Sequence, residues 1–74
     1  MTNDPDEIAA IVDKLESIGE QLDDLITDRL RSALSSARES GQPDPAILAE
    51  EKKLARARRS VAKAASILRP VLSD

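Results

Sequence analysis

Apolar residues recur through the first half of the chain at steps of three and four, the spacing of one face of an α-helix. Asp4 and Pro5 provide an N-terminal cap and a first helical residue, and Gly41 suits a left-handed C-terminal cap. The pattern predicts a helix over about residues 5–39. Its apolar stripe comprises Ile8, Ile11, Leu15, Ile18, Leu22, Leu25 or Ile26, Leu30, Ala33 and Ala37.

A second stripe follows with a stricter period, because Ile47, Leu54, Val61 and Leu68 are spaced by seven. Ala57 and Ala64 are expected at the alternate seam positions. The step Asp44-Pro45 repeats the cap-and-proline signal, and Arg69-Pro70 closes the pattern. We therefore expect a turn at 40–44, a helix over about 45–69 and a short tail at 70–74.

The two stripes predict an all-α fold, an antiparallel two-helix hairpin (αα-hairpin) that forms a single domain over residues 1–74. One hairpin has a thin core, and chains this short usually need a disulfide, a bound metal or a partner to be stable. We expect homodimerisation to complete a four-helix bundle with coiled-coil packing. The predicted core and dimer-interface residues are Ile8, Ile11, Leu15, Ile18, Leu22, Ile26, Leu30, Ile47, Leu54, Val61 and Leu68.

Composition removes several functional classes. The 74 residues include no Cys, no His and no aromatic residue, so thiol and imidazole catalysis and thiolate metal sites are absent. We expect no metal, no cofactor and no enzymatic activity. No apolar run is long enough to cross a bilayer, and the acidic start does not resemble a signal peptide, so we expect a cytoplasmic protein without a membrane partner.

Charge is segregated along the chain. Residues 1–28 hold nine acids and one base, whereas residues 41–74 hold seven bases and four acids. An acidic stripe recurs every four residues in the first helix, at Glu16, Glu20, Asp24 and Asp28. A basic stripe in the second helix comprises Lys52, Arg56, Arg59 and Lys63. The simplest interpretation is that the stripes pair, within one hairpin or across a dimer, and set orientation. We expect Arg29 and Arg31 to form ion pairs with Glu50 and Glu51 across the turn.

Two other interpretations leave one stripe free for a partner. The basic stripe can meet the phosphates of a nucleic acid, and a dimer would carry two such stripes. The acidic stripe can instead hold a basic protein, as an antitoxin or an inhibitor does.

Two short stretches resemble the all-helical chorismate mutase. They are the aliphatic run that ends in Arg, from Leu22 to Arg29, and the step Asp44-Pro45 that opens the next helix. The resemblance implies a helical enzyme with an arginine-lined site. The chain departs from that pattern because no Arg follows Asp44-Pro45 and no third helix is predicted, so the family is not assigned.

The sequence favours a small helical protein–protein interaction module with a regulatory, adaptor or assembly role. We expect it to act through an apolar helix face oriented by the two charged stripes, with a second copy and another protein as partners. A nucleic-acid-binding hairpin dimer is the alternative.

Overall fold

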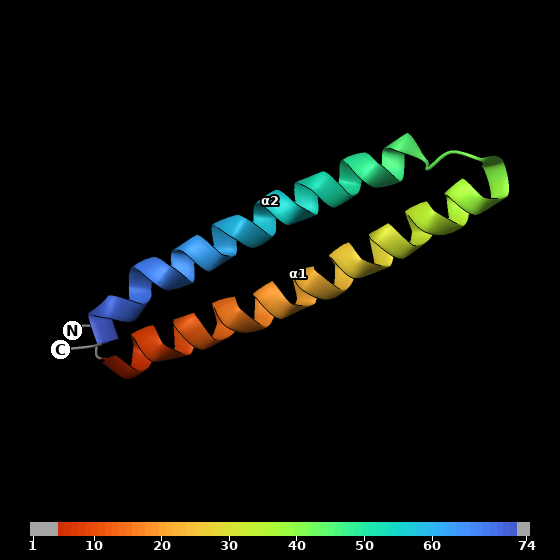
Figure 1. Ribbon diagram of the computed structural model, residues 1–74. Coiled ribbons are helices and arrows are strands. Elements are labelled where there is room, and N and C mark those ends of the chain that lie inside the picture. The colour runs from red at the N-terminus through yellow and green to blue at the C-terminus, as the bar shows by residue number, and fades with distance from the viewer. Residues whose placement is uncertain (1–4, 73–74) are drawn as a thin grey trace.

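The computed structural model describes residues 5–72 as two long antiparallel helices followed by one short turn of helix (Figure 1). Helix α1 spans Pro5–Ser40, α2 spans Pro45–Leu68, and the 3-10 helix η1 spans Arg69–Leu72. The all-helical hairpin predicted from the apolar spacing is confirmed. The predicted cap at Asp4 lies outside the described residues.

The turn between the helices follows its local sequence. Gly41 has a φ of 84°, which only glycine adopts at little cost, and its N–H donates to the carbonyl of Ala37 at 2.7 Å. Asp44 caps α2, since its side-chain oxygen accepts from the N–H of Ala46 at 2.9 Å. Pro45 then occupies the first helical position, where no N–H is needed. Both predicted turn signals are therefore confirmed.

The two helices meet along one seam whose buried and half-buried positions alternate by four and three residues. In α1 these positions are Ile8, Val12, Leu15, Gly19, Leu22, Ile26, Arg29, Ala33 and Ser36. In α2 and η1 they are Ile47, Glu51, Leu54, Arg58, Val61, Ala65, Leu68 and Leu72. Among the described apolar residues, only Val12, Ala33 and Ala65 are buried, at 4%, 6% and 2% exposure.

The seam runs along a different edge of the α1 stripe from the one expected. Ile11, Ile18 and Leu30 retain 49%, 44% and 45% of their exposure in the hairpin, and Val12 is buried in their place. The apolar sector of α1 is wider than one neighbouring helix can cover, so the apolar spacing alone does not determine which edge turns inward. The other eight predicted core residues are half-buried.

The alternate seam positions of α2 also differ from the prediction. They are Glu51, Arg58 and Ala65, which lie one residue after the expected register, while Ala57 is exposed and Ala64 half-buried at the flank. Steps of four from Ile47, Leu54 and Val61 lead to these residues, so two charged side chains enter the seam. The alanines lie beside the seam instead of inside it.

The start of α1 extends beyond the last residue of α2, and η1 covers it. η1 packs against α1, and Leu72 is half-buried there. The residues that follow α2 therefore pack on the first turns of α1.

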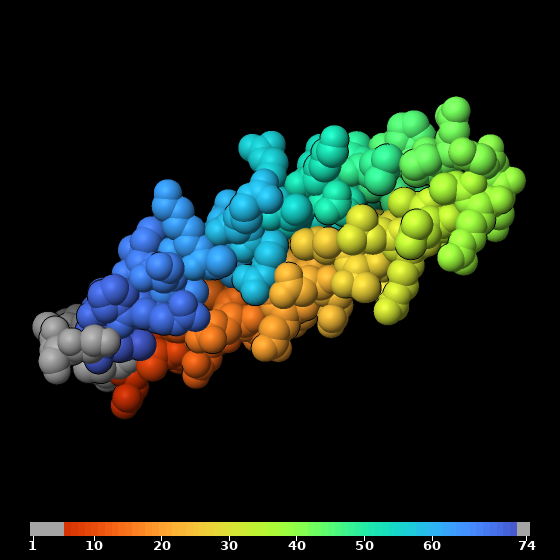
Figure 2. Space-filling view, viewed as in Figure 1, coloured from red at the N-terminus to blue at the C-terminus, as the bar shows by residue number. Residues whose placement is uncertain are grey.

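The molecule is a rod of 58 × 20 × 14 Å. Its radius of gyration is 17.1 Å, against about 11 Å for a compact domain of this length. It exposes 5699 Å², whereas a compact monomer of 8.0 kDa exposes about 4,450 Å². The space-filling view shows the two helices side by side along their whole length (Figure 2). Each helix therefore keeps most of its circumference in solvent.

Candidate interaction surfaces

Two ion pairs link α1 to α2 and set their register, and a third links α1 to η1. Arg29 Nε lies 2.6 Å from Glu50 Oε1, and Arg58 Nε lies 2.9 Å from Asp23 Oδ1. A third pair joins Arg69 Nη2 to Glu16 Oε2 at 3.4 Å. Residue i of α1 accordingly lies level with about residue 80 − i of α2. The expected pairing of Arg29 with Glu50 is confirmed, whereas Arg31 contacts Asp28 in its own helix at 3.9 Å.

Gly19 makes room for a charged side chain in the seam. A Cβ atom built at this residue would lie 2.6 Å from Nη1 and 2.9 Å from Cζ of Arg58. The Arg58 guanidinium thus lies directly on the glycine backbone while its Nε donates to Asp23. The missing side chain of Gly19 thus leaves the space that this guanidinium occupies.

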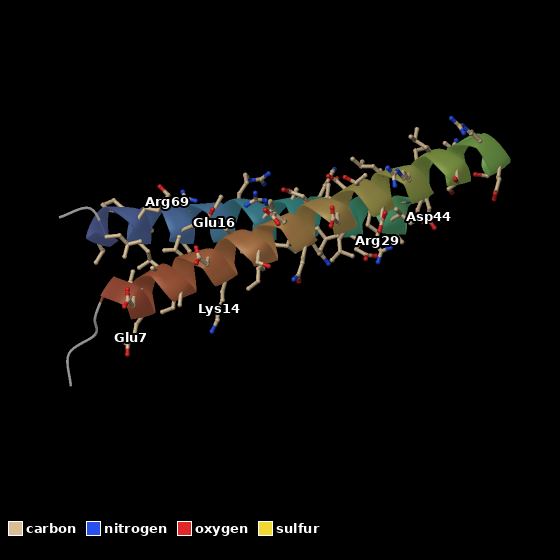
Figure 3. The ribbon with its side chains drawn as sticks, turned by 90° about the horizontal axis from the view of Figure 1, so that it is seen from below. Glu7, Lys14, Glu16, Arg29, Asp44 and Arg69 are labelled. Carbon is tan, nitrogen blue, oxygen red and sulfur yellow. The ribbon has the colours of Figure 1, made fainter. Side chains whose placement is uncertain are left out.

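The two-helix layer has two sides of different character. Glu16 and Arg69 lie on one side, and Lys14 lies on the other (Figure 3). Helical periodicity assigns the remaining residues from these positions. Near the chain ends, the first side carries the Glu16–Arg69 and Asp23–Arg58 pairs. On the opposite side, apolar side chains lie next to the seam there, with Glu7 and Lys14 at their outer edge, and the charged pair Arg29–Glu50 lies toward the turn.

We call this second surface the apolar face. It comprises Ile11, Ile18 and Leu25 of α1, Ala57, Ala64 and Ile67 of α2, and Val71 of η1. Its large side chains stay between 42% and 61% exposed. Ile11, Ile18 and Leu25 are spaced by seven, so they form one row along α1 beside a row of small residues on α2. Large apolar side chains that stay exposed in one row are typical of a protein interface.

A smaller apolar hollow lies at the turn end, on the side that carries Glu16 and Arg69. It is lined by Leu30, Ala33, Leu34, Ala37, Pro43 and Leu48. Leu34 is 59% exposed. The predicted core residue Leu30 therefore contributes to this surface hollow and not to the seam.

The acidic and basic stripes do not pair with each other within the hairpin. Within residues 5–72, none of Lys52, Arg56, Arg59 and Lys63 lies within 4.0 Å of a carboxylate. In the acidic stripe, Glu16 contacts Arg69 and Asp28 contacts Arg31, while Glu20 and Asp24 form no ion pair in the described part. The interhelical pairs use arginines outside the basic stripe, because Arg29 and Arg58 lie at the seam and Arg69 lies beside it. The stripes therefore do not pair within one hairpin, and their pairing across a dimer stays a prediction.

The basic stripe faces outward from α2. Arg56, Arg59 and Lys63 line a shallow hollow together with Ser60. The same part of the chain, residues 5–72, contains no group of three or more side chains suited to hold a metal ion. It also contains no helix that is both long and apolar enough to cross a membrane.

Comparisons with protein-family models, curated proteins and solved structures found no match to the chain.

Proposed function

We propose that the chain is a helical protein–protein interaction module that acts by packing its apolar face against another helical surface. Self-association into a four-helix bundle is the form of docking that we expect, in a regulatory, adaptor or assembly role. The observation that supports this proposal is the row formed by Ile11, Ile18 and Leu25, which no other described part of the chain covers. Burying these side chains is favourable by roughly 25 cal/mol per Å² of apolar surface.

The thin core points in the same direction. Three of the large apolar residues of α1 lie on the apolar face, whereas Val12 is the one large α1 side chain in the described chain that is buried. Domains of this size seldom gain more than about 3–5 kcal/mol from one core. A second helical layer on the apolar face adds stability where the hairpin lacks it.

The test is the molar mass in solution by light scattering, read with refractive index because the chain has no Trp or Tyr. We expect a dimer at low and at high salt, since apolar burial is not screened. Ile18→Glu should give a helical monomer, and Ser17→Glu, at the neighbouring exposed position that points away from the apolar face, should stay dimeric. A wild-type chain that is monomeric and fully helical at high concentration would contradict the proposal.

A second candidate function is nucleic-acid binding through the basic stripe. It is favoured by the absence of carboxylate partners around these four exposed cations within residues 5–72. Without aromatic residues for base stacking, such binding would rest on the phosphate backbone of a duplex.

The matching test is fluorescence anisotropy of a labelled RNA or DNA duplex at increasing salt. Binding that falls steeply with salt and is lost in Lys52→Glu/Arg56→Glu/Arg59→Glu supports this function, provided that circular dichroism shows unchanged helicity. Absence of binding at low salt refutes it.

A further inference from the structure

We infer that the occupant of the apolar face is a second copy, related by a two-fold axis parallel to the long axis of the hairpin. Helix α1 of each copy then packs on α2 of the other. The inference rests on the proposed function and specifies its partner and its orientation.

The first argument is the match of side-chain size across the apolar face. Ile18 lies level with about residue 62 and Leu25 with about residue 55, so each lies within two residues of the level of an alanine on the apolar face, Ala64 or Ala57. A two-fold axis parallel to the helices keeps these levels and exchanges the helices. Each large α1 side chain then meets the small residues of the partner's α2, which lets the helices approach closely. An axis across the helices would instead place large residues on large and alanine on alanine.

The second argument is charge. Residues 5–28 of α1 hold eight acids and one base, whereas α2 holds six bases and two acids. Packing α1 on α1 would bring like charges together, and packing α1 on the partner's α2 brings opposite charges together. The acidic first part of α1 and the basic α2 therefore favour the same arrangement as the side-chain sizes do.

At the outer edge of the apolar face, the proposed orientation brings one specific pair of opposite charges together. Asp28 lies level with about residue 52, which places it beside the partner's Lys53 in the proposed dimer. In the single hairpin, Asp28 has only a 3.9 Å contact with Arg31, and Lys53 has no carboxylate within 4.0 Å in residues 5–72. Gln21, one heptad earlier on the same edge, lies level with about residue 59 and so beside the partner's Ser60.

The exposed area is large enough for such an interface. The hairpin exposes about 1,200 Å² more than a compact monomer of its mass. A stable interface buries about 800 Å² of each partner. The excess surface of the hairpin is thus larger than the area that one such interface buries on each copy.

Disulfide cross-linking tests the orientation, because the chain has no native cysteine. Gln21→Cys and Ser60→Cys are made in separate chains, mixed and oxidised. We expect the mixed disulfide between residues 21 and 60 to dominate. A dominant disulfide between two copies of Gln21→Cys would overturn the orientation and leave the proposed function intact, whereas a monomeric wild type would overturn both.

A charge exchange tests the edge pair. Asp28→Lys and Lys53→Asp should each raise the dimer Kd about tenfold, since each puts two like-charged contacts into the symmetric dimer, and the double variant should restore it. Glu20→Lys and Arg59→Asp make the same charge changes outside the interface and should leave the Kd nearly unchanged. Failure of the double variant to recover the wild-type Kd would refute the pair.

Discussion

The contact between Gly19 and Arg58 yields a prediction whose magnitude follows from the structure. Replacing a glycine by alanine inside a helix normally stabilises it by about 1 kcal/mol. At residue 19 the added Cβ would lie 2.6 Å from Arg58 Nη1, so the guanidinium has to move. Moving it breaks the 2.9 Å contact with Asp23, a partly exposed ion pair that contributes about 0–1 kcal/mol. The two effects nearly cancel, so we expect Gly19→Ala to change the unfolding free energy by less than about 0.5 kcal/mol.

The same substitution should behave differently once the arginine is gone. In an Arg58→Ala background nothing opposes the helix propensity, and Gly19→Ala should stabilise by about 1 kcal/mol. The coupling energy of this double-mutant cycle is then roughly 0.5–1 kcal/mol. Urea unfolding followed by circular dichroism measures it, at one fixed chain concentration because association shifts the midpoint. Ala10→Gly, at an exposed position of α1, calibrates the propensity in this helix. Equal effects of Gly19→Ala in both backgrounds would refute the account.

The remaining predictions concern single side chains and use the same unfolding assay. Val12→Ala should lower the unfolding free energy by about 1.5–2 kcal/mol because it removes two buried methyl groups. Leu34→Ala, at an exposed position, should lower it by less than about 0.5 kcal/mol. Equal losses would show that Val12 is not in the core. Asp44→Ala should lower the unfolding free energy by about 1 kcal/mol, because the capping hydrogen bond from Ala46 is lost. Asp44→Asn should keep most of this stabilisation, because an amide oxygen can accept the same hydrogen bond. Gly41→Ala should destabilise by about 1 kcal/mol through its positive φ alone, since no atom lies within 4 Å of the added methyl group; an unchanged stability would show that the turn adopts another conformation.

The helices and the turn could be predicted from the sequence because their signals are local. Pro45, Gly41 and Asp44 determine their backbone by their own chemistry. The register of the seam could not be predicted, because α1 offers two adjacent apolar edges. One passes through Ile11 and Ile18, and the other through Val12 and Gly19.

The second edge carries a glycine and so looks weaker when each helix is considered alone. It faces Arg58 in the folded chain, however, and the glycine is where the guanidinium fits. A signal was present in the sequence, since a glycine and an arginine both fall at strict heptad positions of their helices. Recognising it requires the alignment of the two helices, which only the ion pairs reveal.

The two ends of the described chain lie together at one end of the rod, opposite the turn (Figure 1). A pulling force applied to both ends therefore acts across the seam and not along it. Such a load separates the helices one turn at a time, beginning at Ile8 and Leu72 and reaching the Arg58–Asp23 pair before the Arg29–Glu50 pair. The hairpin is consequently weak under tension between its termini, and the turn is the last part to open.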